Sequence, residues 1–150
     1  MQEEKLKQTA TGKVITCATI IIDPTGSILG CHPTGKAPNQ MYDLPKGCAD
    51  EGEDDLSAAL RELKEETGLI LESKDLQDLG IHTYLRNKDI HTFLCRVPKL
   101  PDTEILDCTS MFEVSGKHFK EIDGFRHIPR DERFRFSRSI QTILQKVIVD

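Results

Sequence analysis

Runs of apolar, β-branched residues alternate along the chain with polar turn sequences, and these runs predict strands. The first, KVITCATIII from Lys13 to Ile22, stops at the turn sequence DPTG and predicts a buried strand. Shorter apolar runs predict further strands at residues 27–31, 80–86, 90–97 and 121–128. The first of these would be the hairpin partner of Lys13 to Ile22, and the next two would form a second hairpin around a turn at residues 87–89.

Two stretches carry the three- and four-residue spacing of an amphipathic helix. In the first, one core-facing stripe is formed by Leu56, Ala59, Leu60 and Leu63. Asp54 or Asp55 can cap the start of this helix, and Gly68 is placed to end it in the left-handed conformation. The second predicted helix runs from Arg133 to Val149, with one apolar face made of Ile140, Ile143, Leu144 and Val147. Such stripes usually bury a helix, so a cofactor or partner groove is the less favoured interpretation of the first.

Strands and helices are interspersed, which predicts the α/β class, or alternatively α+β, around a mixed sheet. Residues 32–40 have the Pro, Gly and Asn content of a loop, and residues 98–104 (PKLPDTE) resemble a linker. At 150 residues the chain is expected to be a single domain spanning residues 1–150.

The composition is typical of a soluble globular protein, with 37% hydrophobic and 30% charged residues. No apolar run approaches the roughly 18 to 20 residues of a membrane span, so no membrane partner is expected. The polar N-terminus lacks the apolar segment of a signal peptide. Five scattered cysteines without a CxxC pair indicate a reduced protein, so we expect a cytoplasmic location. His82 and His91 are expected to be strand-surface histidines, because no second ligand lies at a metal-like spacing.

The net charge of −5 hides an asymmetry along the chain. Residues 47–78 contain eleven acids and three bases, whereas residues 117–138 contain seven bases and four acids. An acidic centre suits cations and a basic flank suits a polyanion, although two solvated faces of opposite sign would give the same counts.

Three glutamates, Glu62, Glu65 and Glu66, crowd one face of the first predicted helix. They span an arc of about 100°, and carboxylates this close do not all stay ionised comfortably without a cation. Hard divalent ions such as Mg²⁺ take oxygen ligands and bridge protein carboxylates to substrate phosphates. Arg61 adds an ion pair that can hold one carboxylate in position. Acidic clusters are also common on solvated helices, so the spacing around this one has to decide between the two interpretations.

That spacing follows a single pattern from Gly47 to Leu69. Gly47 is followed by five residues and Glu53, then by seven residues and Arg61-Glu62-Leu63, and then by Glu65-Glu66 and Gly68-Leu69, each after one residue. This pattern resembles the signature of the Nudix hydrolase family, G-x5-E-x7-R-E-U-x-E-E-x-G-U with U aliphatic, at every defined position. A chance match in a chain of this length has a probability of roughly 10⁻⁸ to 10⁻⁷ from average residue frequencies.

The resemblance extends to both sides of the motif. Residues 42–47 (YDLPKG) are similar to the W-x-L-P-K-G lead-in of members that act on dinucleoside polyphosphates and on the 5′ end of RNA, with Tyr42 where tryptophan is common. Residues 121–126 (EIDGFR) are similar to the E-F-D-G-W-R strand of the same branch.

The resemblance implies a Nudix α/β/α sandwich with a mixed sheet, in which the motif forms a loop, a helix and a loop. It implies hydrolysis of a nucleoside diphosphate linked to another moiety, with Mg²⁺ or Mn²⁺ as cofactor. Carried over by position, the metal ligands would be Glu62, Glu65, Glu66, the Gly47 carbonyl and, from outside the motif, Glu121. Glu53 and Arg61 would orient this cluster. Glu62 is the first candidate for the general base and Glu121 the second, and Glu121 is alternatively an edge-strand acid without a role.

The basic flank suggests where the phosphates of the substrate bind. Candidates for phosphate contacts are Lys46, Arg126, Arg130 and Lys120. Candidates for stacking on a base are Tyr42, Tyr84 and Phe125, although a partly buried aromatic ring is more often part of the core.

The expected partner is a small-molecule nucleotide. Dinucleoside polyphosphates come first, then ADP-ribose or another nucleotide sugar, and then the 5′ end of RNA or an inositol pyrophosphate. Tyr84 lies close to the tyrosine marker of the dinucleoside polyphosphate branch, whereas Pro98 lies too far from the motif to match the ADP-ribose marker. A Nudix-fold module that binds a nucleotide without cleaving it is the alternative from a different class.

Overall fold

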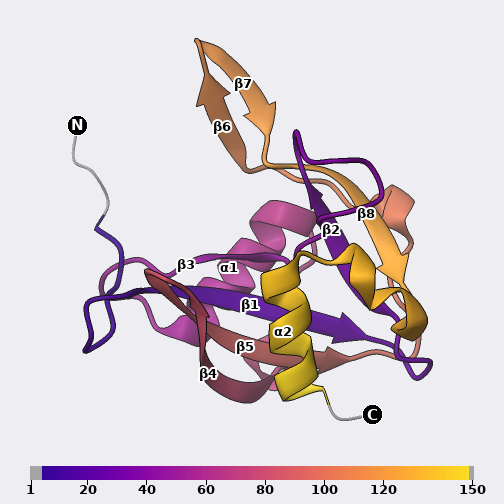
Figure 1. Cartoon of the computed structure of the whole chain (residues 1–150), viewed down its shortest axis with the longest axis horizontal. Helices are drawn as coiled ribbons and strands as arrows, with labels where there is room; N and C mark the ends of the chain where they lie inside the picture. The colour runs from indigo at the N-terminus through magenta and orange to yellow at the C-terminus, as the bar shows by residue number, and fades with distance from the viewer. Residues whose placement is uncertain (1–4, 149–150) are drawn as a thin grey trace.

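The computed structural model of the protein describes residues 5–148, which are built around a six-stranded mixed sheet (Figure 1). The strands run in the order β4-β5-β1-β2-β8, and β3 pairs with β1 beside this path. Within this sheet β1 and β5 pair in parallel, and the other neighbouring strands pair antiparallel. The bounds of these strands are β1 Val14–Ile22, β2 Ile28–Pro33, β3 Lys46–Cys48, β4 Gln77–Leu85, β5 Lys88–Arg96 and β8 Ile122–Ile128.

A separate hairpin, β6 (Met111–Val114) and β7 (Lys117–Lys120), projects from the body of the molecule (Figure 1). Ser115 and Gly116 join its strands, both at positive φ (52° and 80°), as the tight turns of two-residue hairpins require. The hydrophobic pattern did not predict this hairpin or the short β3, because strands of three or four residues carry too little alternation to be recognised.

Helix α1 (Asp55–Thr67) begins and ends as predicted. The Asp54 side chain accepts a hydrogen bond from the Ser57 N–H at 2.8 Å, and Gly68 closes the helix at φ 82°. The predicted second helix is wrong at its start. The chain instead forms a short 3₁₀ helix at Arg130–Arg135, and α2 spans Arg138–Val147, with Ser137 as its N-cap. Residue 149 lies outside the described residues.

Shorter 3₁₀ turns are η1 (Ser73–Asp75) and η2 (Thr103–Ile105), the latter at the end of the segment predicted as a linker. Neither helix in the described part of the chain is long and apolar enough to cross a membrane.

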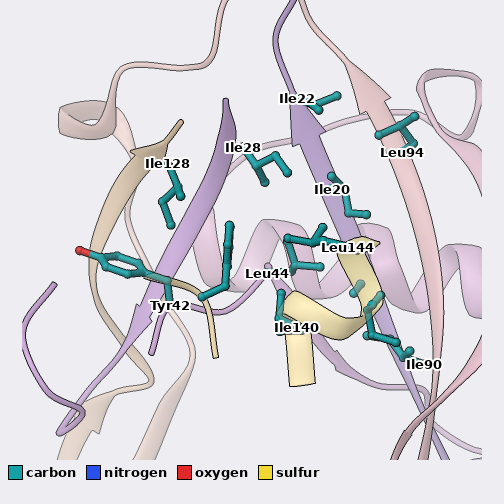
Figure 2. Close-up of a cluster of buried hydrophobic side chains, with 13 residues drawn as sticks. Ile20, Ile22, Ile28, Tyr42, Leu44, Ile90, Leu94, Ile128, Ile140 and Leu144 are labelled. Carbon is teal, nitrogen blue, oxygen red and sulfur yellow. The ribbon is translucent and has the colours of Figure 1, made fainter. Parts of the chain in front are cut away.

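Strand β1 places alternate side chains on the two faces of the sheet, and each face is covered by one helix. Ile15 and Cys17 pack with Ala58 and Ala59 of α1. On the other face the core includes side chains from β1, β2, β5, β8 and α2 and from the segment before β3. Ten of its residues are labelled in Figure 2: Ile20, Ile22, Ile28, Tyr42, Leu44, Ile90, Leu94, Ile128, Ile140 and Leu144. This helix–sheet–helix arrangement confirms the expected α/β sandwich with a mixed sheet.

His91 is more enclosed than expected for a strand-surface residue. Its side chain is 13% exposed, and its ring nitrogens lie 2.7 Å from Asp55 of α1 and 2.7 Å from Asp78 of β4. The histidine thereby ties the β4–β5 hairpin to the start of the motif helix. His82 makes a local contact, with Nε2 3.1 Å from the Leu79 carbonyl oxygen.

Candidate active site

Strand β3 lies directly against the glutamate face of α1. It pairs with β1 at Thr16–Ala18, which brings Gly47 onto the Glu62 carboxyl group. A Cβ atom at position 47 would lie 2.0 Å from Glu62 Cδ, so only glycine fits without displacing that group. The neighbouring Lys46 N–H donates a hydrogen bond to Glu66 Oε1 at 3.0 Å. The start of the sequence motif, on β3, is therefore in contact with the glutamates of the motif on α1.

Arg61 lies at the centre of the carboxylate cluster. Its Nε and Nη2 donate to the two oxygens of Glu53 at 2.9 and 3.0 Å. Its Nη1 donates to Glu62 Oε1 at 2.8 Å and lies 3.4 Å from Glu65 Oε2. Paired bonds of this kind fix the position of a carboxylate as well as neutralising it. The structure thus brings together Arg61 and three of the glutamates that the sequence singled out.

Glu62 and Glu66 are the buried glutamates of the motif helix, and burial changes their acidity. Glu62 is 9% exposed and Glu66 is 5% exposed. Burial raises the pKa of Glu62 to about 7, against the effect of Arg61 and with the help of Glu65. Burial also raises the pKa of Glu66 to about 8, against the hydrogen bond from the Lys46 N–H. The side chains therefore hold more negative charge than their own surroundings stabilise.

This donor set fits a hard divalent cation such as Mg²⁺ or Mn²⁺, which binds carboxylate and carbonyl oxygens. The negative charge of Glu121 also acts on both Glu62 and Glu66. Among the described residues, no three His, Cys, Asp or Glu side chains already converge as a metal site. Arg61 is instead the cation that bridges Glu62 and Glu65.

Glu121 is placed beside α1 by contacts that the sequence did not reveal. Its N–H donates to the Ser110 carbonyl at 2.9 Å, and its own carbonyl accepts from the Thr34 N–H at 3.0 Å. The segment before Ser110 in turn covers the C-terminal end of α1, because the Thr109 N–H donates to the Glu65 carbonyl at 2.7 Å. These bonds join the base of the hairpin, the end of β2 and the motif helix.

Lys46 connects the cluster to the other face of the sheet. Its Nζ lies 3.3 Å from Asp43 Oδ2. Burial opposes the charge on Lys46, but Asp43, Tyr84 and Glu66 outweigh it and raise its pKa. Lys46 therefore lies close to Glu66, and Tyr84, which was also predicted to contact substrate, lies close to Lys46. Asp43 was not among the predicted residues, although its place three residues before Lys46 was a possible signal.

Three other residues predicted to contact the substrate have contacts outside the glutamate cluster. Tyr42 is 7% exposed and its ring belongs to the core (Figure 2), so the structure gives it a packing position rather than an open face for a base. Arg126 donates to Asn39 Oδ1 at 3.0 Å and lies 3.8 Å from Glu132. Arg130 lies against Gly26, in the turn that follows β1.

Known proteins are similar to this chain in sequence and in fold. The sequence matches the NUDIX domain over residues 12–135. It is 33% identical over 136 residues to an uncharacterized 17.7 kDa protein of the e-segB intergenic region of Enterobacteria phage T4, covering 88% of this chain and 89% of that protein.

Among solved structures, a C. elegans Ap4A hydrolase in a binary complex is 18% identical, with a TM-score of 0.60 over 87% of this chain and 93% of that chain. A bifunctional NMN adenylyltransferase/ADP ribose pyrophosphatase from Francisella tularensis, complexed with AMP and a Mn ion, is also 18% identical. Its TM-score is 0.62, over 89% of this chain and 41% of that one. At these identities the two structures show a shared fold. Since the domain match covers most of the chain and includes the whole motif, the chain belongs to the Nudix family and is a Nudix pyrophosphohydrolase.

Proposed function

We propose that this enzyme hydrolyses the pyrophosphate linkage of nucleoside diphosphate derivatives, with dinucleoside polyphosphates of the Ap3A and Ap4A type as its first substrates. The observation that carries the proposal is the buried carboxylate cluster of α1 with Lys46 beside it, because a charged lysine next to a cation-binding site suits a chain of phosphates. The C. elegans Ap4A hydrolase, which this chain matches over nearly its whole length, supports the choice of substrate.

ADP-ribose is the second candidate substrate. The Francisella tularensis protein, whose name includes ADP ribose pyrophosphatase, supports it through a match over 41% of that chain. The two candidates share a diphosphate bridge and differ in what lies beyond it.

The cofactor would be Mg²⁺ or Mn²⁺, held by Glu62, Glu65, Glu66, the Gly47 carbonyl and Glu121. When bound, such an ion neutralises charge on the phosphate oxygens and lowers the barrier to attack by water. The Mn ion in the Francisella tularensis complex supports a requirement of this kind.

The chain's own residues would position the reactants. Glu62 is the first candidate for the general base: its Oε1 accepts from Arg61, which leaves Oε2 to take a proton from the attacking water. Glu121 is the second candidate. Lys46 would hold a phosphate oxygen beside Glu66, and Glu53 would keep Arg61 in place through its paired hydrogen bonds.

The test is a substrate panel of Ap3A, Ap4A, ADP-ribose, nucleoside triphosphates and 5′-triphosphorylated RNA, with Mg²⁺, with Mn²⁺ and with EDTA. We expect metal-dependent cleavage that is fastest with a dinucleoside polyphosphate. Glu66→Gln should lose about 10³-fold in kcat, the effect of removing a main electrostatic stabiliser. Glu51→Gln is the matched control, because Glu51 is an exposed acid of the motif loop outside the cluster.

Two results would contradict the proposal. If dinucleoside polyphosphates were the poorest substrates of the panel, the choice of substrate would be wrong. If nothing were cleaved while nucleotides still bound, the chain would be a recognition module and the catalytic roles would be wrong.

A further inference from the structure

A cavity of about 520 Å³ lies at the root of the β6–β7 hairpin, and we refer to it as the hairpin cavity. Its walls are the end of β7, the first half of β8 and the segment that includes η2. This volume falls within the range of roughly 300 to 1,000 Å³ of small-molecule sites, which combine apolar walls with a few polar groups.

Aromatic side chains supply the apolar walls of the hairpin cavity. Phe119 of β7 lines it and is 40% exposed, although its ring also contacts the Phe112 ring at 5.7 Å between centroids. Phe125 of β8 lines it as well and is anchored by packing against the buried core. A partly exposed ring next to a fixed one offers a surface on which a flat aromatic ligand can stack.

The polar groups of the hairpin cavity are mainly hydrogen-bond acceptors. Asp107 Oδ1 pairs with Lys120 Nζ at 2.5 Å, and Asp123 Oδ1 lies 2.5 Å from His32 Nδ1. Each of these two carboxylates has a second oxygen, and Glu104 adds a third acid to the lining. Three acids and one lysine disfavour a phosphate group here, whereas N–H groups on the edge of a base would find acceptors.

The hairpin cavity adjoins the carboxylate cluster through the backbone. Lys120 and Ile122 line the cavity and directly flank Glu121, whose charge acts on Glu62 and Glu66. Asp107, on another wall, donates its N–H to the Thr67 carbonyl at the end of α1, at 3.0 Å. The lining of the cavity therefore flanks the predicted metal ligand Glu121 along the chain and is bonded to the end of the motif helix.

We propose that the hairpin cavity binds a nucleobase of the substrate, with the base stacked on Phe119 and its N–H groups donated to the second oxygens of Asp107 and Asp123. The phosphates would then extend past Glu121 towards the carboxylate cluster and Lys46. The inference rests on the proposed function, because it names where a nucleoside end of that substrate is held.

Binding to the metal-free protein tests the hairpin cavity without catalysis. In EDTA, calorimetric titration would compare AMP and GMP with ribose 5-phosphate, which carries the same phosphate but no base. We expect the nucleotides to bind at least about tenfold more tightly, the contribution of stacking one base on an aromatic ring. Phe119→Ala and Phe119→Leu should both lose this preference, and Val114→Ala should keep it. Val114 is exposed on the same hairpin and does not line the cavity.

Equal binding of nucleotide and ribose 5-phosphate by the unaltered protein would overturn the inference, and so would an unchanged preference in both Phe119 variants. Circular dichroism would confirm that each variant is folded, and the leucine variant keeps a branched apolar side chain at position 119 while removing the ring.

Kinetics separates this inference from the proposed function. With a dinucleoside polyphosphate and saturating Mg²⁺, Phe119→Ala should raise KM about 10- to 100-fold relative to Val114→Ala. If the unaltered protein cleaves this substrate and the Phe119 variants match Val114→Ala, the function stands and the base site is wrong. If the unaltered protein cleaves no substrate but shows the Phe119-dependent preference for nucleotides, the base site stands and the proposed function is wrong.

Discussion

Gly47→Ala is the change whose effect on activity follows most directly from the structure. The new Cβ would lie 2.0 Å from Glu62 Cδ, whereas ordinary contacts begin at 3.4 Å. The carboxyl group must therefore move by about 1.4 Å to reach a normal contact distance. A misplacement of about 1 Å in an active site can cost about 10²-fold in rate, which corresponds to about 2.7 kcal/mol of transition-state stabilisation. We expect kcat with saturating Mg²⁺ to fall by at least that factor.

The fold should survive this substitution, because the group that moves is the end of a flexible side chain. Overpacking of this kind costs about 1 to 3 kcal/mol, and urea unfolding would measure it. Gly12→Ala is the matched control. Gly12 adopts φ 79°, and an added methyl group there would meet nothing within 4 Å, so alanine strains the backbone by about 1 kcal/mol and touches no functional residue. If Gly47→Ala kept kcat within about threefold of the unaltered enzyme, the position of Glu62 would not be critical and its assigned role would be wrong.

Three further substitutions test the cluster and its helix. Arg61→Gln removes the cation bonded to Glu53, Glu62 and Glu65 and should destabilise the metal-free protein by about 2 to 3 kcal/mol. Urea unfolding in EDTA would show this loss, and its absence would mean that the arginine is not needed to hold the carboxylates. Glu66→Gln keeps an acceptor for the Lys46 N–H but removes a charge whose pKa burial raises to about 8. In EDTA at pH 8 the variant should be at least as stable as the unaltered protein. The reason is that folding raises the pKa of Glu66, so the stability of the unaltered protein falls as the pH rises towards that pKa. Mg²⁺ should raise Tm only in the unaltered protein, and a clearly lower Tm for the variant in EDTA would contradict this reasoning. Asp54→Ala removes the cap of α1 and should cost about 1 kcal/mol in urea unfolding with kcat unchanged; a loss of kcat would mean that the cap also positions the glutamates.

The elements that the sequence predicted well are those with long, regular patterns. The unbroken apolar run of β1 and the stripe and caps of α1 are local features, so they could be recognised without knowing the rest of the chain. The hairpin at residues 111–120 and the 3₁₀ helix at Arg130–Arg135 could not be recognised in this way. Their strands and turns are too short to repeat a period, and their conformations depend on contacts with other segments.

The candidate site divides along the same line. Arg61 and the glutamates of α1 lie on one helix, so their spacing alone placed them together. The contact of Gly47 with Glu62, the hydrogen bond from Lys46 to Glu66 and the contact of Thr109 with Glu65 join residues 15 to 44 positions apart. Such contacts follow from how β3 and the base of the hairpin pack against α1, which no local pattern encodes.

The arrangement around Arg61 also explains how a helix can carry so many carboxylates before any metal binds. Arg61 bonds to Glu53, Glu62 and Glu65, while Glu66 accepts from the Lys46 N–H, so every motif glutamate has a partner within the chain. One guanidinium nevertheless cannot balance three carboxylates, and the Lys46 ammonium is shared with Asp43. Burial is the main cause of the raised pKa values of Glu62 and Glu66, and the neighbouring carboxylates add to it. Because the chain supplies enough positive charge to fold but too little to neutralise the cluster, a divalent cation would gain most of its binding energy from charge that the protein leaves uncompensated.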